Sequence, residues 1–591
     1  MKPRRQNPNL RLRLYVLAAV LLGGSALLVA RAAEMQLLRS EFYQQKGENR
    51  FLRDIPIPTS RGMITDRNGE PLAVSTPVAS IWANPPELLK TPERIPELAA
   101  ALGLDPGVLR QRIDERAERE FLFLRRHMNP DDAEVVMALG IPGVNSQREF
   151  RRFYPTGDIA AHVLGFTNID DVGQEGLELA FNDWLTGAPG TKRVIRDRKG
   201  RTVENVDLVR PAKPGRDLAL SIDRRLQHLL YRELKRALEE NQAASGTAVI
   251  TDVATGEVLA MVNLPTYNPN TREGADPSNR RNRAVTDVFE PGSVIKVFTV
   301  AAALETGRYQ PETLIETSPG YMPLARHTIR DIRNFGTVDL TRLLTKSSNI
   351  AAVKLALDMP NEHLHDVLRR FGFGELSGAG FPGESPGVLT SPRRWGVLEK
   401  ATISYGYGLS TNALQIALAY AALGNGGVMM PATFVRGGAG QGRSVIDPDL
   451  ARTLVGMLET VTGPEGSATR ARVSGYRVAG KTGTSRRSIA GGYEKRYVSL
   501  FAGLVPVSNP RLSMVVVIND PDPAQHFGGL VAAPVFGRAM ADALRILDVP
   551  PDDVQQWYVA APLTPMPGID GELPPEAEAA AAPLPDSGVP E

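Results

Sequence analysis

The longest uninterrupted apolar segment of the chain lies near its N-terminus. Residues 14–30 read LYVLAAVLLGGSALLVA, a run of seventeen positions without a charge. At about 1.5 Å of rise per residue, a helix of this length just crosses a hydrocarbon core of about 30 Å when its flanking residues reach the interface. Every face of the helix is apolar, which differs from the one-sided pattern of a surface helix. The pattern predicts a transmembrane anchor over residues 14–33.

Charge on either side of this segment predicts its orientation. Acidic residues follow it at Glu34 and Glu41, whereas the residues before it include five basic and no acidic side chains: Lys2, Arg4, Arg5, Arg11 and Arg13. By the positive-inside rule, residues 1–13 are a cytoplasmic tail and the folded part is periplasmic, on a single-pass inner-membrane protein. The alternative is a cleaved signal peptide, because Ala30-Arg31-Ala32 has a small-x-small pattern, although the apolar run exceeds the usual 7–15 residues.

The pattern of the next 180 residues is mixed. Residues 31–53 are charged and helix-prone, as in a stalk. Strand-like stretches at 63–65 and 71–74 flank Arg67-Asn68-Gly69, a hairpin turn signal. The Pro- and Gly-containing stretch 209–215 predicts a linker. We therefore expect a stalk and a first folded domain over residues 34–215.

From residue 216 the pattern predicts an α+β domain. A helical run at 224–241 precedes a buried hairpin at 246–262, and further strands are predicted at 476–483, 497–507 and 511–519, followed by a helix at 530–547. Helical patterns fill 293–306, 337–370 and 411–424. Strands at both ends with helices between them favour one antiparallel sheet covered by helices, plus a helical subdomain, over residues 216–555. Residues 556–591, rich in Pro, Ala and Glu, are expected to be a disordered tail.

Composition excludes several classes of function. The chain has 68 Lys and Arg against 66 Asp and Glu, and without the five N-terminal basic residues the balance is 63 to 66, so no nucleic-acid-binding face is expected. The absence of Cys excludes disulfides, thiolate metal sites and cysteine nucleophiles. The seven His form no H-E-x-x-H motif, and His363 and His365 do not share a helix face, so no metal or cofactor is expected.

One S-x-x-K motif is a candidate nucleophile and base. Ser293 follows Pro291-Gly292, which predicts a turn leading into a helix. Three residues apart on a helix lie on one face, so the Lys296 amine can reach the Ser293 hydroxyl. Lysine can take that proton only if burial or a nearby cation lowers its pKa. The alternative is a helix-capping Ser with a solvated Lys, since about two such matches are expected by chance in a chain of this length.

Two further motifs complete a candidate site. Lys481-Thr482-Gly483-Thr484 lies at the end of a predicted strand, where Thr482 and Thr484 share a face and could hold a carboxylate, while Gly483 admits a close backbone. A turn with an exposed Lys is the alternative. The pattern S-x-N occurs at 347–349 and at 410–412, each before an apolar helical run, and either could be a helix cap. Serine with S-x-x-K, S-x-N and K-T-G in this order is the set of the active-site-serine penicillin-recognising enzymes.

With these motifs the sequence resembles the class B penicillin-binding proteins, and among them the division-specific transpeptidases. The resemblance covers residues 1 to about 550 and includes these stretches: Arg61-Gly-Met-Ile-Thr-Asp-Arg-Asn-Gly69, Arg152-Phe-Tyr-Pro-Thr-Gly157, Ala161-His-Val-Leu-Gly-Phe-Thr167, Gly176-Leu-Glu178, Tyr267-Asn-Pro-Asn270, Asp287-Val-Phe-Glu-Pro-Gly-Ser293, Lys346-Ser-Ser-Asn349, Tyr405-Gly-Tyr-Gly-Leu409 and Lys481-Thr-Gly-Thr484. The family implies a non-catalytic pedestal domain near the membrane and a transpeptidase domain above it.

The resemblance also implies roles for the candidate residues. Ser293 would attack the carbonyl between the two terminal D-alanines of a peptidoglycan stem peptide, Lys296 would act as base, and Ser347 would relay a proton to the leaving D-alanine. The substrate-binding residues would be Asn349, Lys481, Thr482, Gly483 and Thr484. β-Lactams would block Ser293, and glycan polymerisation would come from the septal membrane glycosyltransferase FtsW and other division proteins.

Three other functions remain open at this point. They are an elongation-type class B enzyme of the lateral wall, a membrane-anchored β-lactam sensor or β-lactamase, and a structural scaffold with a relict site. A class A β-lactamase needs a deacylating Glu in an E-x-x-L-N run, which this sequence lacks.

Overall fold

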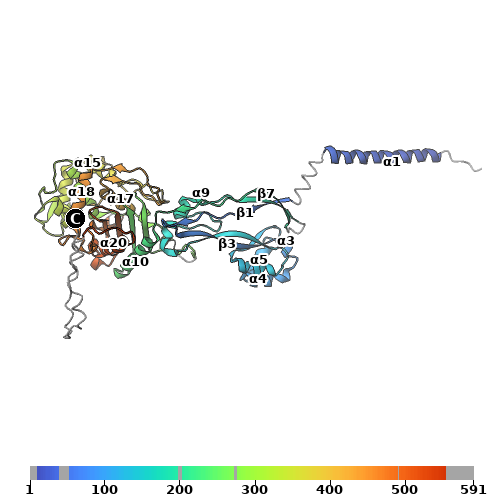
Figure 1. Cartoon of the computed structure of the whole chain (residues 1–591), viewed down its shortest axis with the longest axis horizontal. Helices are drawn as coiled ribbons and strands as arrows, with labels where there is room; N and C mark the ends of the chain where they lie inside the picture. Colours follow the sequence, from blue (N-terminus) through green and yellow to red (C-terminus); the bar gives the residue numbers. More distant parts are fainter. Residues whose placement is uncertain are drawn as a thin grey trace, which may run out of the picture.

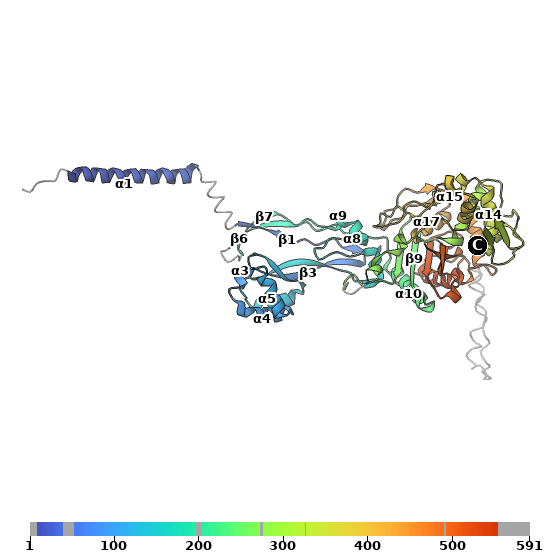
Figure 2. The same cartoon turned by 180° about the vertical axis from the view of Figure 1, so that it is seen from behind.

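A computed structural model describes residues 9–38, 52–196, 202–271, 276–325, 327–489 and 492–553. Over residues 52–553 the protein is a rod, with a strand-rich pedestal at one end and a larger globular domain at the other (Figures 1 and 2). The predicted tail 556–591, the first eight residues and most of the predicted stalk lie outside the described residues. The predicted domain boundary at residue 215 stays a prediction.

The N-terminal apolar run is helical. Helix α1 spans Asn9–Ala33 and continues as a short π-helix, Glu34–Leu38. Across α1 and the π-helix, the segment Leu10–Gln36 contains an 18-residue window with a mean hydropathy of 2.1, none of which is buried against the rest of the chain. In the described part of the chain it is the one helix long and apolar enough to cross a membrane.

Two sheets form the pedestal. One is antiparallel in the order β1-β6-β7, and the other has the order β4-β3-β2-β8, with β5 paired to β3. The strands are β1 (Leu52–Ile57), β2 (Ile64–Thr65), β3 (Pro71–Ala83), β4 (Leu122–Met128), β5 (Val144–Phe153), β6 (Gly190–Arg196), β7 (Thr202–Arg210) and β8 (Leu218–Ala219). The helices are α3 (Pro85–Leu88), α4 (Ile95–Leu102), α5 (Pro106–Asp114), α6 (Pro130–Ala138), α7 (Ala161–Leu164), α8 (Gly176–Ala180) and α9 (Asn182–Leu185).

The predicted hairpin of the pedestal is confirmed, but its second strand is much longer than predicted. β2 and β3 pair antiparallel around the turn at Gly69, where φ is +89°. β3 runs for 13 residues instead of the predicted four because it also pairs with β4 and β5, partners that the local pattern cannot reveal. The stretch predicted as a linker is partly strand, since β7 reaches Arg210 and Lys213 bridges to Ala188.

Three motifs of the pedestal meet in one buried ion cluster. Both Arg61 Nε and Arg152 Nε donate to the Glu178 carboxylate at 2.6 Å, and all three side chains are at most 1% exposed. Arg61 also donates to the Glu178 carbonyl, and Arg152 to the Gly62 carbonyl. Charge-assisted hydrogen bonds are strong and directional, and here they are shielded from water, so they restrict the relative positions of the three side chains. The cluster therefore holds three segments together: α8, the end of β5, and the stretch that precedes β2.

The end of the pedestal nearest the globular domain shares that domain's hydrophobic core, whereas α4, α5 and α6 of the pedestal pack around a separate one. Tyr154 belongs to the same cluster of buried side chains as Ile222 and Leu226. The Asn270 side chain bonds both backbone groups of Tyr154, accepting from its N–H at 3.0 Å and donating to its carbonyl at 2.9 Å. This pairing joins the motif Arg152–Gly157 of the pedestal to the motif Tyr267–Asn270 of the globular domain.

The globular domain is built on a five-stranded antiparallel sheet in the order β10-β9-β19-β18-β17. Its strands are β9 (Ser245–Asp252), β10 (Val258–Leu264), β17 (Ala479–Ile489), β18 (Gly492–Val505) and β19 (Leu512–Asn519). Helices α10 (Arg224–Glu240) and α20 (Ala533–Ile546), with the short α19 (Gly528–Val531), pack on one side, and α17 (Ala413–Gly424) covers the other with α12 (Lys296–Glu305) and α18 (Pro448–Thr462). The predicted sheet covered by helices is confirmed.

The remaining elements form the helical subdomain and small hairpins. The helices are α11 (Arg283–Thr286), α13 (Leu340–Lys346), α14 (Asn349–Asp358), α15 (Asn361–Arg370) and α16 (Val397–Ser404), and the short strands are β11 (Ile315–Glu316), β12 (Tyr321–Leu324), β13 (His327–Arg330), β14 (Thr337–Val338), β15 (Val428–Met429) and β16 (Arg443–Ser444). Helix α14 packs against α12 and α16, which brings the start of α14 beside the start of α12.

Candidate active site

Ser293 lies in a tight turn at the start of a buried helix. A 3-10 helix, Gly292–Ile295, leads directly into α12, as the Pro-Gly signal predicts. Gly292 has φ +57°, and its N–H donates to the Gly406 carbonyl at 3.0 Å. The backbones at this point are so close that a Cβ on Gly406 would lie 1.9 Å from the Gly292 oxygen. The turn is therefore held from behind by the Tyr405–Leu409 loop.

Two buried lysines share one serine hydroxyl. Lys296 Nζ lies 3.1 Å and Lys481 Nζ 3.0 Å from Ser347 Oγ, and both lysines are fully buried. Lys296 also donates to the Ser347 carbonyl at 2.6 Å and to Asn349 Oδ1 at 2.7 Å. The structure thus brings the S-x-x-K, S-x-N and K-T-G motifs together.

Lys296 and Ser293 form no hydrogen bond in this structure, although their spacing lets the amine reach the hydroxyl. In the described part of the chain, the half-buried Ser293 hydroxyl has no hydrogen-bond partner. The Lys296 amine is directed instead toward the Ser347 carbonyl, the Ser347 hydroxyl and Asn349 Oδ1.

Burial determines the charge of both lysines. Desolvation lowers the pKa of Lys296 well below its usual value, and repulsion by the Lys481 charge lowers it further. The negative charge of Asp331 acts in the opposite direction, but its effect is smaller. Desolvation lowers the pKa of Lys481 to about 7. A neutral Lys296 can accept the Ser347 proton while Ser347 Oγ accepts from Lys481, which is a path for protons between the two amines.

The S-x-N motif at 347–349 is positioned by a carboxylate that the sequence analysis missed. Ser347 ends α13 in the left-handed region, with φ +61°, and Ser348 caps α14 by accepting from the Ala351 N–H. Asp331 accepts from the N–H groups of Asn349 and Ile350 and from the Ser348 hydroxyl. Asp331 lies in a loop after β13 with no recognisable motif, so only the fold reveals it.

β17 is the last strand of the sheet, so its outer edge pairs with no other strand among the described residues. The K-T-G-T motif lies inside this strand, not at its end as predicted, because pairing with β18 carries it to Ile489. Lys481 points into the cluster, while the Thr482 hydroxyl is 2.9 Å from that of Ser467 and Thr484 Oγ1 accepts from the Gly528 N–H. A Cβ on Gly292 would lie 3.6 Å from the Thr484 nitrogen, which places the serine turn directly beside this edge.

Other candidates from the sequence have ordinary structural roles. Asn412 of the second S-x-N caps α17 in a reciprocal capping box with Gln415. His363 bonds the Ala302 carbonyl, and among the described residues no group of three acidic or His side chains could hold a metal ion.

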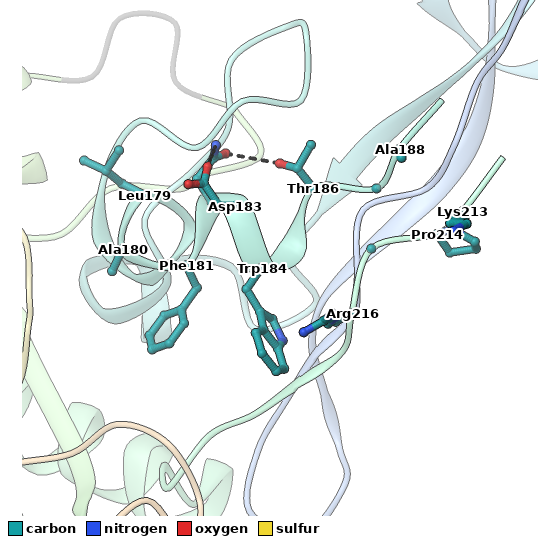
Figure 3. Close-up of a pocket in the computed structure, with 13 residues that line it drawn as sticks. Leu179, Ala180, Phe181, Asp183, Trp184, Thr186, Ala188, Lys213, Pro214 and Arg216 are labelled. Carbon is teal, nitrogen blue, oxygen red and sulfur yellow. Dashed lines mark hydrogen bonds between the residues drawn. The ribbon is translucent and has the colours of Figure 1, made fainter. Parts of the chain in front are cut away.

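A separate hollow of about 860 Å³ lies far from these motifs, in the pedestal. It is formed between α8–α9 and residues 213–216, where the Arg216 guanidinium stacks on Trp184 at 4.8 Å (Figure 3). It holds none of the candidate catalytic side chains.

Two family models match the two parts of the chain. Residues 56–220 match the family model "Penicillin-binding Protein dimerisation domain", and residues 246–541 match "Penicillin binding protein transpeptidase domain". The "Peptidoglycan D,D-transpeptidase FtsI" of Escherichia coli strain K12 is 42% identical over 93% of this chain and 95% of its own length. The chain belongs to the class B penicillin-binding proteins.

Two further relatives place the chain within this family. The "Probable peptidoglycan D,D-transpeptidase PbpC" of Pseudomonas aeruginosa is 43% identical over 92% of this chain and 95% of its own length. The crystal structure of a peptidoglycan synthetase from Bifidobacterium adolescentis superposes with a TM-score of 0.67 at 26% identity, covering 85% of this chain and 97% of that one. As a class B penicillin-binding protein, the chain is a D-Ala-D-Ala transpeptidase of peptidoglycan synthesis.

Proposed function

We propose that this penicillin-binding protein cross-links peptidoglycan at the division septum through an acyl-enzyme on Ser293. The observation that carries the proposal is the single hydroxyl of Ser347 held by two buried lysines, beside both the serine turn and the free edge of β17. This arrangement brings together a nucleophile, a base with a lowered pKa, a path for protons and a strand edge that can pair with an extended peptide.

The first half-reaction forms the acyl-enzyme. Lys296, neutral, takes the Ser293 proton as the oxygen attacks the carbonyl between the two D-alanines. The new C–O bond forms, the C–N bond breaks, and the proton passes through Ser347 to the leaving amine. Backbone N–H groups of Ser293 and Thr484 hold the oxyanion, a kind of contact whose loss typically costs about 10²–10³ in rate.

Binding of the donor peptide uses the rest of the motif set. The peptide lies along the edge of β17, where Gly483 allows close approach. The ammonium of Lys481 and the hydroxyls of Thr482 and Thr484 bind its terminal carboxylate, and Asn349 holds its backbone. In the second half-reaction an amine on a neighbouring glycan strand attacks the acyl carbon and gives up its proton to Lys296. The C–O bond to Ser293 breaks, and Lys296 returns the proton to the departing Ser293 oxygen.

The same chemistry predicts inactivation by β-lactams. Opening of the lactam ring by Ser293 leaves no departing amine, so the acyl-enzyme persists. The apolar helix α1 supports a single-pass inner-membrane location with a cytoplasmic N-terminus and a periplasmic catalytic domain. The pedestal resembles no polymerase in its motifs, so the glycan strands come from a partner of the FtsW type together with other division proteins.

Labelling with fluorescent penicillin tests the nucleophile. Wild type is expected to form a long-lived adduct and Ser293→Ala none, whereas the matched control Ser410→Ala, in the second S-x-N, keeps the label. Labelling that survives in Ser293→Ala refutes the assignment, and rapid loss of the adduct in wild type indicates a β-lactamase. Depletion in cells separates the two transpeptidase roles: filaments support the septal role, and rounded cells support the lateral-wall alternative.

A further inference from the structure

The two threonines proposed to bind the substrate carboxylate each lie against a second polar group. A hydroxyl has one proton to donate and two lone pairs that can accept. Thr484 Oγ1 accepts from the Gly528 N–H at 3.0 Å. A backbone N–H can only donate, so this contact leaves the Thr484 proton available for an incoming carboxylate. The Gly528 N–H therefore favours Thr484 as a hydrogen-bond donor toward the substrate.

The hydroxyl of Thr482 has a different neighbour, the Ser467 hydroxyl at 2.9 Å, and either oxygen could be the donor. Among the described residues, neither hydroxyl has another hydrogen-bond partner. Ser467 is exposed and Thr482 is half-buried, so a ligand can reach the pair. A carboxylate only accepts hydrogen bonds, so Thr482 must donate its single proton to bind one. Ser467 must then donate to Thr482, as the Gly528 N–H donates to Thr484.

Ser467 belongs to a short loop, residues 463–467, that is held on two sides. On one side Lys346 Nζ donates to the Glu465 carbonyl at 2.7 Å and lies 3.0 Å from Glu465 Oε2. On the other side the loop packs on Gly529, where an added Cβ would lie 2.2 Å from the Ser467 carbonyl oxygen. These contacts tie the position of Ser467 both to the residue before the S-x-N motif and to the glycine pair that bonds Thr484.

We propose that Ser467 is a positioning residue for recognition of the terminal carboxylate of the donor peptide. Its hydroxyl donates to Thr482 Oγ1, and this directs the Thr482 proton toward the carboxylate. The inference rests on the proposed transpeptidase function and adds a residue that lies outside the S-x-x-K, S-x-N and K-T-G motifs. Only the fold brings Ser467 to the site, through the loop before β17.

The test compares two substrates on the full-length protein in detergent. Both are thioesters of D-alanine, and their leaving groups differ only in ending with a carboxylate or with the matching amide. An amide both donates and accepts hydrogen bonds, so its binding does not require Thr482 to donate. Ser467→Ala is expected to lower kcat/KM for the carboxylate substrate roughly three- to tenfold, the loss of one hydrogen bond, and to leave the amide substrate within about twofold of wild type.

The kinetic parameters separate a role in positioning from a role in folding. The carboxylate is bound in the ground state and in the transition state alike, so the loss should appear as a higher KM, with kcat within about twofold of wild type. Ser467→Thr keeps a hydroxyl and should keep the preference for the carboxylate substrate. Ser474→Ala removes an exposed serine a few residues further on and is the matched control, which should change neither substrate.

A double substitution shows whether Ser467 acts through Thr482. In a Thr482→Ala background the partner hydroxyl is gone, so adding Ser467→Ala should lower kcat/KM for the carboxylate substrate by less than about twofold more. A loss that is undiminished in this background means that Ser467 acts by another route, and it overturns the positioning role.

The remaining outcomes distinguish failure of the inference from failure of the proposed function. Wild-type kinetics of Ser467→Ala with both substrates overturn the inference. An equal loss with both substrates gives Ser467 a structural role only, and this also overturns it. The proposed function survives either result if penicillin labels wild type and not Ser293→Ala. A wild type that penicillin does not label overturns the proposed function itself.

Discussion

The charge of Lys481 leads to a prediction about pH. Its pKa is lowered to about 7 by burial, so it changes charge in the range where enzymes are assayed. As a ligand of the substrate carboxylate it must be an ammonium, whereas Lys296, whose pKa is lowered well below its usual value, must be neutral to act as base. The acylation rate for carboxylate-bearing donors should therefore fall as the pH rises through about 7.

The magnitude follows from the two protonation states. For a single group with a pKa near 7, the protonated fraction drops about tenfold for each pH unit above that value, and kcat/KM should follow it because it reports the free enzyme. A hydrogen bond to a charged group contributes about 1.5–3 kcal/mol, so Lys481→Gln should lower kcat/KM at pH 6 by roughly 10- to 100-fold. The variant should also lose the fall above pH 7, because its amide does not titrate.

The assay is the second-order rate of acylation by fluorescent penicillin between pH 5 and 9, on wild type and Lys481→Gln. A thioester donor without a carboxylate is the control and should show a weaker alkaline fall. A wild-type rate that stays level or rises up to pH 9 would refute the reasoning, as would an alkaline fall of equal size in the variant. Because the two lysines share Ser347, the observed midpoints belong to the pair.

Three substitutions test other parts of the structure. Ser347→Ala removes the oxygen between the two lysines and should slow acylation by roughly 10²–10⁴, measured as single-turnover labelling; a change below threefold would exclude a proton relay. Gly406→Ala places a Cβ 1.9 Å from the Gly292 oxygen and should abolish labelling, whereas Gly408→Ala, with a similar φ but a nearest contact of 3.4 Å, should retain it; equal labelling of the two would contradict the packing argument. Glu178→Gln leaves two buried guanidinium groups without their carboxylate and should destabilise the pedestal by about 3–5 kcal/mol, seen as a lower midpoint of denaturant unfolding, and an unchanged midpoint would mean the cluster contributes little.

Local sequence signals were sufficient for much of the sheet. The Ala-Thr-Gly turn at 254–256 between two apolar runs predicts the β9–β10 hairpin, and the structure confirms it, with Gly256 at φ +73°. The length of β17 could not be predicted in the same way. Its second half, Ser485-Arg-Arg-Ser-Ile489, has little strand character and is extended because β18 pairs with it, a contact that depends on the whole domain.

The candidate site also contains residues that the sequence could identify and residues that only the tertiary structure reveals. Ser293, Ser347 and Lys481 belong to short motifs, so the sequence could identify them as candidates. The structure joins Ser347 to Lys481 by a hydrogen bond and places the turn of Ser293 beside β17, while the Ser293 hydroxyl itself is not part of that network. Asp331 belongs to no motif, and its role comes from contacts across the fold. A helix cap and a catalytic serine have the same local sequence, so the S-x-N match at 347–349 is favoured from the sequence only because Lys346 adds a cation and the family resemblance points there. The structure shows Asn412 of the other match as the cap of α17.

The arrangement of the two lysines links the stability of the domain to its chemistry. Both amines lie close to one hydroxyl, so their nitrogens are no more than about 6 Å apart, and two positive charges that close inside a dry core would repel each other strongly. The repulsion and the cost of desolvation both disappear when Lys296 is neutral, and these two effects lower its pKa. The folded state therefore selects the protonation state that a general base requires, and any substitution that admits water around Lys296 should cost activity before it costs the fold.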